Sequence, residues 1–117
     1  ANASLVTLAA QGTGTVNSAD IVNVNGKGIQ LVIDITVITA GTLTVTLQGK
    51  DIASGKYYTI LASAALAAVA TTRLTVYPGI PVLANVTQND ILPRTWRISA
   101  AAVTGPITAT IGASVIN

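Results

Sequence analysis

The hydrophobic pattern of the chain has a period of two residues almost everywhere. In residues 42–48 (TLTVTLQ), Leu43, Val45 and Leu47 alternate with threonines and a glutamine. Successive side chains of a β-strand point to opposite faces, so this spacing predicts a strand with one buried and one solvated face. Thr, Val and Ile fill most of the pattern, and their branching at Cβ suits a pleated sheet better than a helix. The pattern therefore predicts an all-β fold.

Turn sequences divide the chain into short extended segments. Residues 25–26 (Asn-Gly), Gly41 and residues 104–106 (Thr-Gly-Pro) are typical of reversals, because Gly and Asn tolerate a positive φ. Residues 51–55 are predicted to form a hairpin loop with Gly55 in a left-handed conformation. The predicted strands are residues 4–9, 14–16, 21–23, 28–39, 42–48, 56–62, 72–77, 95–103 and 106–115.

Three segments need separate comment. Residues 28–39 are apolar on one face and carry Val32 and Ile38 on the other, which predicts a central strand with its second face partly covered. Residues 78–93 lose the alternation and are expected to cross from one sheet to the other. Residues 63–70 (SAALAAVA) are rich in Ala, the best helix former, so a turn or two of helix and an extended segment both remain open.

About eight short strands at this spacing predict a single-domain antiparallel β-sandwich. Jelly-roll and immunoglobulin-like topologies are both compatible with the pattern. Residues 1–16 are expected to form an extended N-terminal arm or the first strand, and residues 17–117 the sandwich. A chain of 117 residues is long enough to bury a substantial core.

The residue types that usually perform catalysis are scarce. The chain has no Cys and no His, and it also lacks Glu. It therefore has no thiol nucleophile, no imidazole and few metal ligands. We expect a protein that is not an enzyme, with no cofactor and no metal site.

The four Asp residues are the only acidic side chains. Asp20, Asp51 and Asp90 lie at predicted turns, where Asp commonly accepts hydrogen bonds from nearby backbone N–H groups. Asp34 interrupts an apolar strand, and we expect it to face outward or to pair across strands with a Lys or Arg.

The charge distribution argues against nucleic acid and membrane partners. The net charge is +2, and the six cationic side chains are scattered along the sequence. No apolar run approaches the length of a transmembrane helix. No basic segment precedes an apolar one at the N-terminus, so no secretory signal is visible.

The aromatic residues are few. Trp96 lies between Arg94 and Arg97, and it is interpreted as a core side chain in preference to an exposed platform for base stacking or cation–π contacts. On a strand, Tyr57 and Tyr58 point to opposite faces, so we expect one in the core and one exposed.

Charged residues make up only 9% of the chain, against about 25% in ordinary soluble proteins. The predicted outer faces carry Thr, Ser, Ala and Gln in place of Lys and Glu. Neutral, flat strand surfaces resist association poorly. We therefore expect much of this surface to be covered by other subunits, as in a structural component of an assembly.

Five stretches, covering nearly the whole chain from about Leu5, resemble small head-associated proteins of tailed bacteriophages. The strings QGKD…SGKYY and NDILPRTWR are the most specific, and Lys-Gly at 27–28 stands where family members commonly have Arg-Gly. The stretches are residues 22–34 (VNVNGKGIQLVID), 46–63 (TLQGKDIASGKYYTILAS), 74–79 (LTVYPG), 89–97 (NDILPRTWR) and 111–116 (IGASVI).

The resemblance implies a virion protein on the capsid exterior, made in the bacterial cytoplasm, that acts as a decoration or cement protein. Its partners would be the major capsid protein and copies of itself, as a dimer or trimer. We expect the N-terminal arm to add to the sheet edge of a neighbour, and three cations to meet an acidic capsid surface. The residues expected at these contacts are Leu5, Val6 and Leu8 in the arm, and Lys56, Arg94 and Arg97.

Two other functions fit the same composition. A tail, neck or fibre sandwich domain of the virion would have the same uncharged strand faces. A carbohydrate- or host-surface-binding jelly roll is the third class, although such sites usually display several exposed aromatic side chains and this chain has only four aromatic residues.

Overall fold

The computed structural model describes residues 2–23, 26–38, 40–90, 92–104 and 106–116. Every regular element in these ranges is a strand, as the alternating pattern predicts. The strands are β1 (Asn2–Gln11), β2 (Gly14–Asn17), β3 (Ile21–Val22), β4 (Gly28–Ile38), β5 (Thr42–Lys50), β6 (Tyr57–Ala62), β7 (Ala70–Val76), β8 (Thr87–Gln88), β9 (Thr95–Val103) and β10 (Ile107–Ile116).

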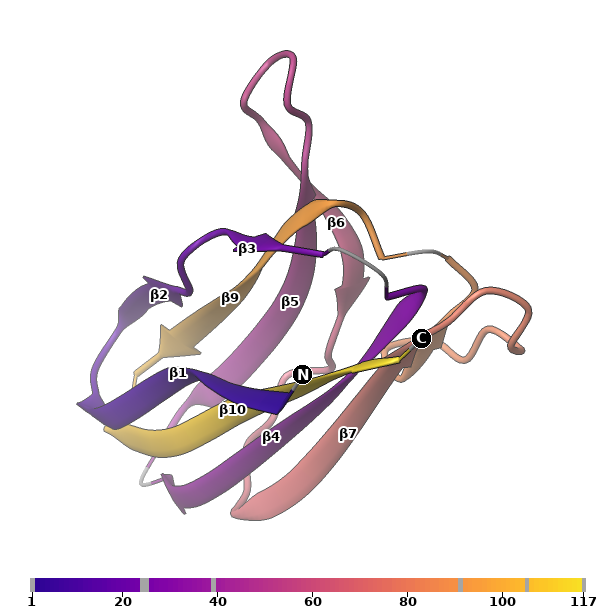
Figure 1. Ribbon diagram of the computed structural model, residues 1–117. Coiled ribbons are helices and arrows are strands. Elements are labelled where there is room, and N and C mark those ends of the chain that lie inside the picture. Colours follow the sequence, from indigo (N-terminus) through magenta and orange to yellow (C-terminus); the bar gives the residue numbers. More distant parts are fainter. Residues whose placement is uncertain (1, 24–25, 39, 91, 105, 117) are drawn as a thin grey trace.

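The strands form two sheets that pack face to face (Figure 1). Sheet A has the order β1-β10-β4-β7-β8, and sheet B has the order β2-β9-β5-β6 with β3 also beside β9. All pairs are antiparallel except β7 with β8. The β5–β6 hairpin extends beyond the body of the sandwich.

The strand order distinguishes the two topologies that the sequence left open. In an immunoglobulin-like sandwich the first two strands share a sheet. Here β1 and β2 lie in different sheets, the chain crosses between sheets repeatedly, and the last strand β10 lies between β1 and β4. This is the arrangement of a jelly roll. The predicted antiparallel β-sandwich is confirmed.

The core consists of the inward-facing side chains of both sheets. In β5 the buried positions are Leu43, Val45 and Leu47, as the alternation predicts. β9 contributes Trp96 and Ile98 from the same sheet, and both are almost inaccessible to solvent. Opposite them, sheet A contributes Leu8, Ile29, Leu31, Ile33, Ile35, Leu74, Val76, Ile107 and Ile111.

The predicted turns at Gly41 and at residues 51–55 have their glycines within the described ranges. In the β5–β6 loop, Gly55 has a φ of 73°, and its N–H donates to the carbonyl of Asp51 at 2.7 Å. Gly41, between β4 and β5, has a φ of 80° and lies so close to the Val103 carbonyl that a Cβ would clash with it. The predicted turn at residues 25–26 includes Asn25, and that at 104–106 includes Gly105; both residues lie outside the described ranges.

Residues 63–70 contain no helix. Leu66 pairs with Leu43 through two backbone hydrogen bonds of 2.9 Å, so the segment continues along the edge of sheet B. Tertiary pairing here outweighs the helix propensity of a short Ala-rich run. Residues 78–93 cross from sheet A to sheet B as expected, and on the way they form the short parallel strand β8, which the sequence did not reveal.

The expectation for residues 28–39 is half right. β4 lies between β10 and β7 and is therefore a central strand. Its outer face is open, however, because Val32 is 39% exposed. The alternation also places Val37 on the core face and Ile38 on the other, and this is wrong. The register of β4 against β10 shifts between Ile35 and Val37, so Val37 is 50% exposed and Ile38 packs against the core.

Two neighbouring residues of β4 test this assignment of faces. Ile33→Ala should lower the free energy of unfolding by about 2–5 kcal/mol, because it leaves a cavity between the sheets. Val32→Ala should lower it by less than about 1 kcal/mol, because its side chain meets solvent. Urea unfolding followed by the fluorescence of Trp96, the only Trp, measures both changes. Equal losses would contradict the faces described here.

Candidate functional site

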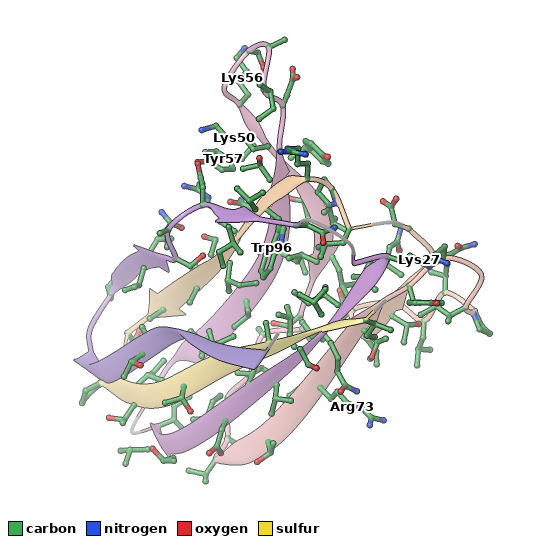
Figure 2. The ribbon with its side chains drawn as sticks, viewed as in Figure 1. Lys27, Lys50, Lys56, Tyr57, Arg73 and Trp96 are labelled. Carbon is green, nitrogen blue, oxygen red and sulfur yellow. The ribbon has the colours of Figure 1, made fainter. Side chains whose placement is uncertain are left out.

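The three cations expected at a partner surface lie at one end of sheet B. Arg97 belongs to β9, where it pairs with Gln48 of β5. Lys56 ends the β5–β6 loop, next to Tyr57 at the start of β6. Arg94 is exposed just before β9, and its carbonyl accepts a hydrogen bond from the N–H of Asn23. The pairing of Arg97 with Gln48 thus puts the start of β9 at the end of β5 from which the hairpin extends. Figure 2 shows Lys56 on that hairpin, with Lys50 and Tyr57 at its base.

An interruption between β2 and β3 places an acidic residue at the same end. The chain pairs Asn17 with Ser99 and resumes at Ile21 with Trp96, so it carries one more residue than β9 over this stretch. Ser18 bridges the gap: its N–H donates to the Ile98 carbonyl, and its hydroxyl oxygen accepts from the Ile98 N–H at 2.9 Å. Asp20 follows this bulge directly.

Asp20 binds two side chains that come from the base of the hairpin. Its Oδ2 lies 3.0 Å from Lys50 Nζ, which is the one salt bridge within the described part of the chain. Its Oδ1 accepts a hydrogen bond of 2.6 Å from the Tyr57 hydroxyl. Lys50 and Tyr57 are themselves paired across β5 and β6. The carboxylate therefore ties the edge of sheet B near β3 to the hairpin.

Arg97 is held between two other side chains of the same surface. Its guanidinium carbon lies 3.5 Å from the centroid of the Tyr57 ring, a cation–π stack. Its Nε donates a hydrogen bond of 2.8 Å to Oε1 of Gln48. The five residues Asp20, Gln48, Lys50, Tyr57 and Arg97 thus form one network, which we call the hairpin-base cluster.

The charges of the hairpin-base cluster reinforce one another. Hydrogen bonds from Tyr57 and Lys50 lower the pKa of Asp20 below its ordinary value of 3.8, and the nearby charge of Arg97 lowers it further. The hydrogen bond to Asp20 and its charge raise the pKa of Lys50 above 10.5. Asp20 and Lys50 are accordingly both ionised across the neutral range, and the cluster keeps a net positive charge.

The aromatic residues differ in part from expectation. Trp96 is 1% exposed, so its interpretation as a core side chain is confirmed. Its buried indole Nε1 has no hydrogen-bond partner among the residues described.

The cation–π contact forms on Tyr57 instead of Trp96. The expectation of one buried Tyr is wrong: Tyr58 lies beside Gly49 at the end of the core and is 48% exposed, and Tyr57 lies on the outer face.

Asp51 and Asp34 have different kinds of partner. Asp51 accepts hydrogen bonds from the Ser54 hydroxyl and the Ala53 N–H, and these bonds lower its pKa, as expected of a turn Asp. Asp20 departs from that expectation, because its partners are side chains. Asp34 does not pair with a cation; it accepts a bond of 3.2 Å from the Thr71 hydroxyl across β4 and β7.

The three arm residues lie in β1, which pairs with β10 of the same molecule. Val6 is opposite Ile111, and the register shifts between Ser4 and Val6, at Leu5. Leu8 is 1% exposed and belongs to the core. Leu8 can therefore anchor a contact with a neighbour only if β1 leaves its own sheet.

Two further searches concern metals and membranes. No group of three acidic, His or Cys side chains that could hold a metal ion occurs among the described residues. No helix long and apolar enough to cross a membrane occurs in the same ranges.

Comparison of the chain with protein-family models, curated proteins and solved structures gives no match. The sequence resemblance to head-associated phage proteins stays a prediction.

The salt bridge gives a pH dependence that Asp20→Asn should remove. Because folding lowers the pKa of Asp20, its contribution to stability is present above pH 3.8 and is lost as the pH falls through the lowered value. Because folding raises the pKa of Lys50, its contribution is present below pH 10.5 and is lost as the pH rises through the raised value. Thermal unfolding of both proteins at a series of pH values measures the difference.

We expect Asp20→Asn to melt at a slightly lower temperature at neutral pH and to converge with the wild type in strong acid. Asp34→Asn is the matched control, since Asp34 accepts a hydrogen bond from the Thr71 hydroxyl and forms no ion pair within the described part of the chain. A difference between wild type and Asp20→Asn that persists below pH 2 would contradict the ionic origin of the effect.

Proposed function

We propose that the chain is a structural virion protein that binds the outer surface of a tailed-phage capsid and stabilises contacts between major capsid subunits. The observation that supports this proposal most strongly is the uncharged part of the outer face of sheet B, which lies beyond the hairpin-base cluster. Thr42, Thr44 and Thr46 of β5 point outward there, opposite Ser99 and Ala101 of β9. A flat face of this composition lacks the charges that keep lone sheets apart.

Exposed apolar side chains support the same proposal. The connection after β7 displays Val82 and Leu83, both at least 60% exposed. The Thr87 hydroxyl holds this loop, because it accepts a hydrogen bond from the Leu83 N–H and donates one to the Pro81 carbonyl. Ile52 is 70% exposed in the loop of the extended hairpin. Exposed apolar patches are typical of surfaces that become buried in a complex. Partners of the proposed assembly are the major capsid protein and further copies of this chain.

A cement protein acts through the thermodynamic linkage between its own binding and the assembly of the shell. A protein that binds the assembled shell, and not the separate subunits, stabilises the shell by mass action. This function needs no reactive side chain and no cofactor. It needs a rigid body with a large complementary surface, and a two-sheet sandwich supplies one.

Imaging of purified phage particles that contain the chain tests the proposal. We expect density for the sandwich in many symmetric copies on the head, including heads that carry no tail. Density on the tail, neck or fibre would replace the proposal with the second virion function. A saturable signal on a glycan array, with no density on the particle, would favour a carbohydrate-binding module.

The three cations at the hairpin end of sheet B are proposed to meet an acidic capsid surface. Replacing Lys56, Arg94 and Arg97 together by Glu should weaken binding to heads at least about tenfold, because like charges would then face each other. Co-sedimentation of the labelled protein with heads measures occupancy. Arg73→Glu, on the outer face of sheet A, is the control. Undiminished occupancy of the triple variant would exclude this contact.

A further inference from the structure

One charged group of the hairpin-base cluster, the Arg97 guanidinium, makes no direct ion pair within the cluster. Asp20 is engaged by Lys50 and Tyr57, and the Nε of Arg97 is engaged by Gln48. Within the described ranges, no carboxylate lies at ion-pair distance from Arg97. The terminal amino groups of the Arg97 guanidinium are therefore available to bind a group outside the chain.

The position of this guanidinium is fixed before any ligand arrives. The Tyr57 ring supports one face of its plane at 3.5 Å, and the bond to Gln48 sets its rotation. The ring is fixed in turn by the bond from its hydroxyl to Asp20. An Arg held in this way has already lost its side-chain freedom on folding, so binding costs less conformational entropy.

The residues around Arg97 favour a partner that is anionic and has a flat surface. Arg97 lies on the outer face of sheet B, where the nearby outward positions Thr46 and Ser99 are small and uncharged. Lys56 on the adjacent hairpin adds positive charge. A planar guanidinium matches the two oxygens of a carboxylate in a bidentate pair, which a Lys ammonium cannot form.

We propose that Arg97, held between Tyr57 and Gln48, binds an Asp or Glu carboxylate of an acidic segment on the partner protein. This inference rests on the proposed function for the identity of that partner, the capsid shell. It assigns to Arg97 a bidentate contact that determines the register of docking. Lys56 and Arg94 then contribute only general attraction, which Lys and Arg supply equally well.

A titration in solution tests the site without the capsid. The full chain labelled with ¹⁵N is titrated with a peptide of ten Glu residues at low salt, and the Nε–H signal of Arg97 is followed by NMR. We expect a saturable shift of this signal. Arg97→Lys keeps the charge but should weaken peptide binding about tenfold, the loss expected for a charge-assisted bidentate pair. Binding by this variant is followed through backbone amide signals of β5 and β9.

Arg73→Lys is the matched control and should bind the peptide as the wild type does. Tyr57→Phe keeps the ring but loses the bond to Asp20, and we expect it to bind with intermediate affinity. Native Trp96 fluorescence shows that each variant is folded. Unchanged affinity of Arg97→Lys, or an equal loss in Arg73→Lys, would overturn the proposal.

Inorganic phosphate distinguishes a carboxylate site from a general anion site. If phosphate shifts the Arg97 signal at the same or a lower concentration than the peptide, the assignment to a carboxylate is wrong. The two proposals fail separately: peptide binding with no density on heads contradicts the capsid function alone. Density on heads with no effect of Arg97→Lys on the titration contradicts the carboxylate contact alone.

Discussion

The sandwich depends on the insertion of β10 between β1 and β4. Neither neighbour pairs with the other, so β1 belongs to sheet A only through its pairing with β10, the last strand of the chain. β10 fits because it alternates large and small buried residues: Ile107 and Ile111 fill the core, whereas Ala109 and Ala113 leave room for the opposite sheet. Pairing over such long sequence separations is generally associated with slow folding, because loop closure costs entropy before the contacts form.

The register that buries the core also positions the hairpin-base cluster. Trp96 and Ile98 must point inward, so Arg97 between them points outward, opposite Gln48. A slip of one residue would bury the guanidinium and expose Trp96, at a large cost in free energy. The packing of Trp96 and Ile98 therefore fixes the position of Arg97 on the outer face. The contacts within the hairpin-base cluster determine only the orientation of its guanidinium.

Period-two alternation was sufficient to locate the eight longer strands, with errors of one or two residues at their ends. It could not reveal β8 or the strand order, because two-residue pairing and sheet connectivity leave no periodic signal. It also missed the contact between Tyr57 and Arg97, which joins β6 to β9 across the intervening β5. Asp20 was expected to bind its own turn; the bulge at Ser18 directs it instead toward Lys50, and a bulge has no sequence signature here.

The contrast between the hairpin-base cluster and the rest of sheet B suggests how affinity and specificity are divided in the proposed assembly. In that assembly the threonine-rich face contributes buried area and shape complementarity to the contact. It does little to determine the register of docking, because the same side chain repeats along β5. A single ordered Arg at one end of that face supplies a directional contact at a defined point. Charged contacts of this kind commonly determine orientation and the rate of association more than total affinity. Loss of Arg97 should therefore affect the accuracy of docking more than the stability of the docked state, whereas loss of the neutral face should do the reverse.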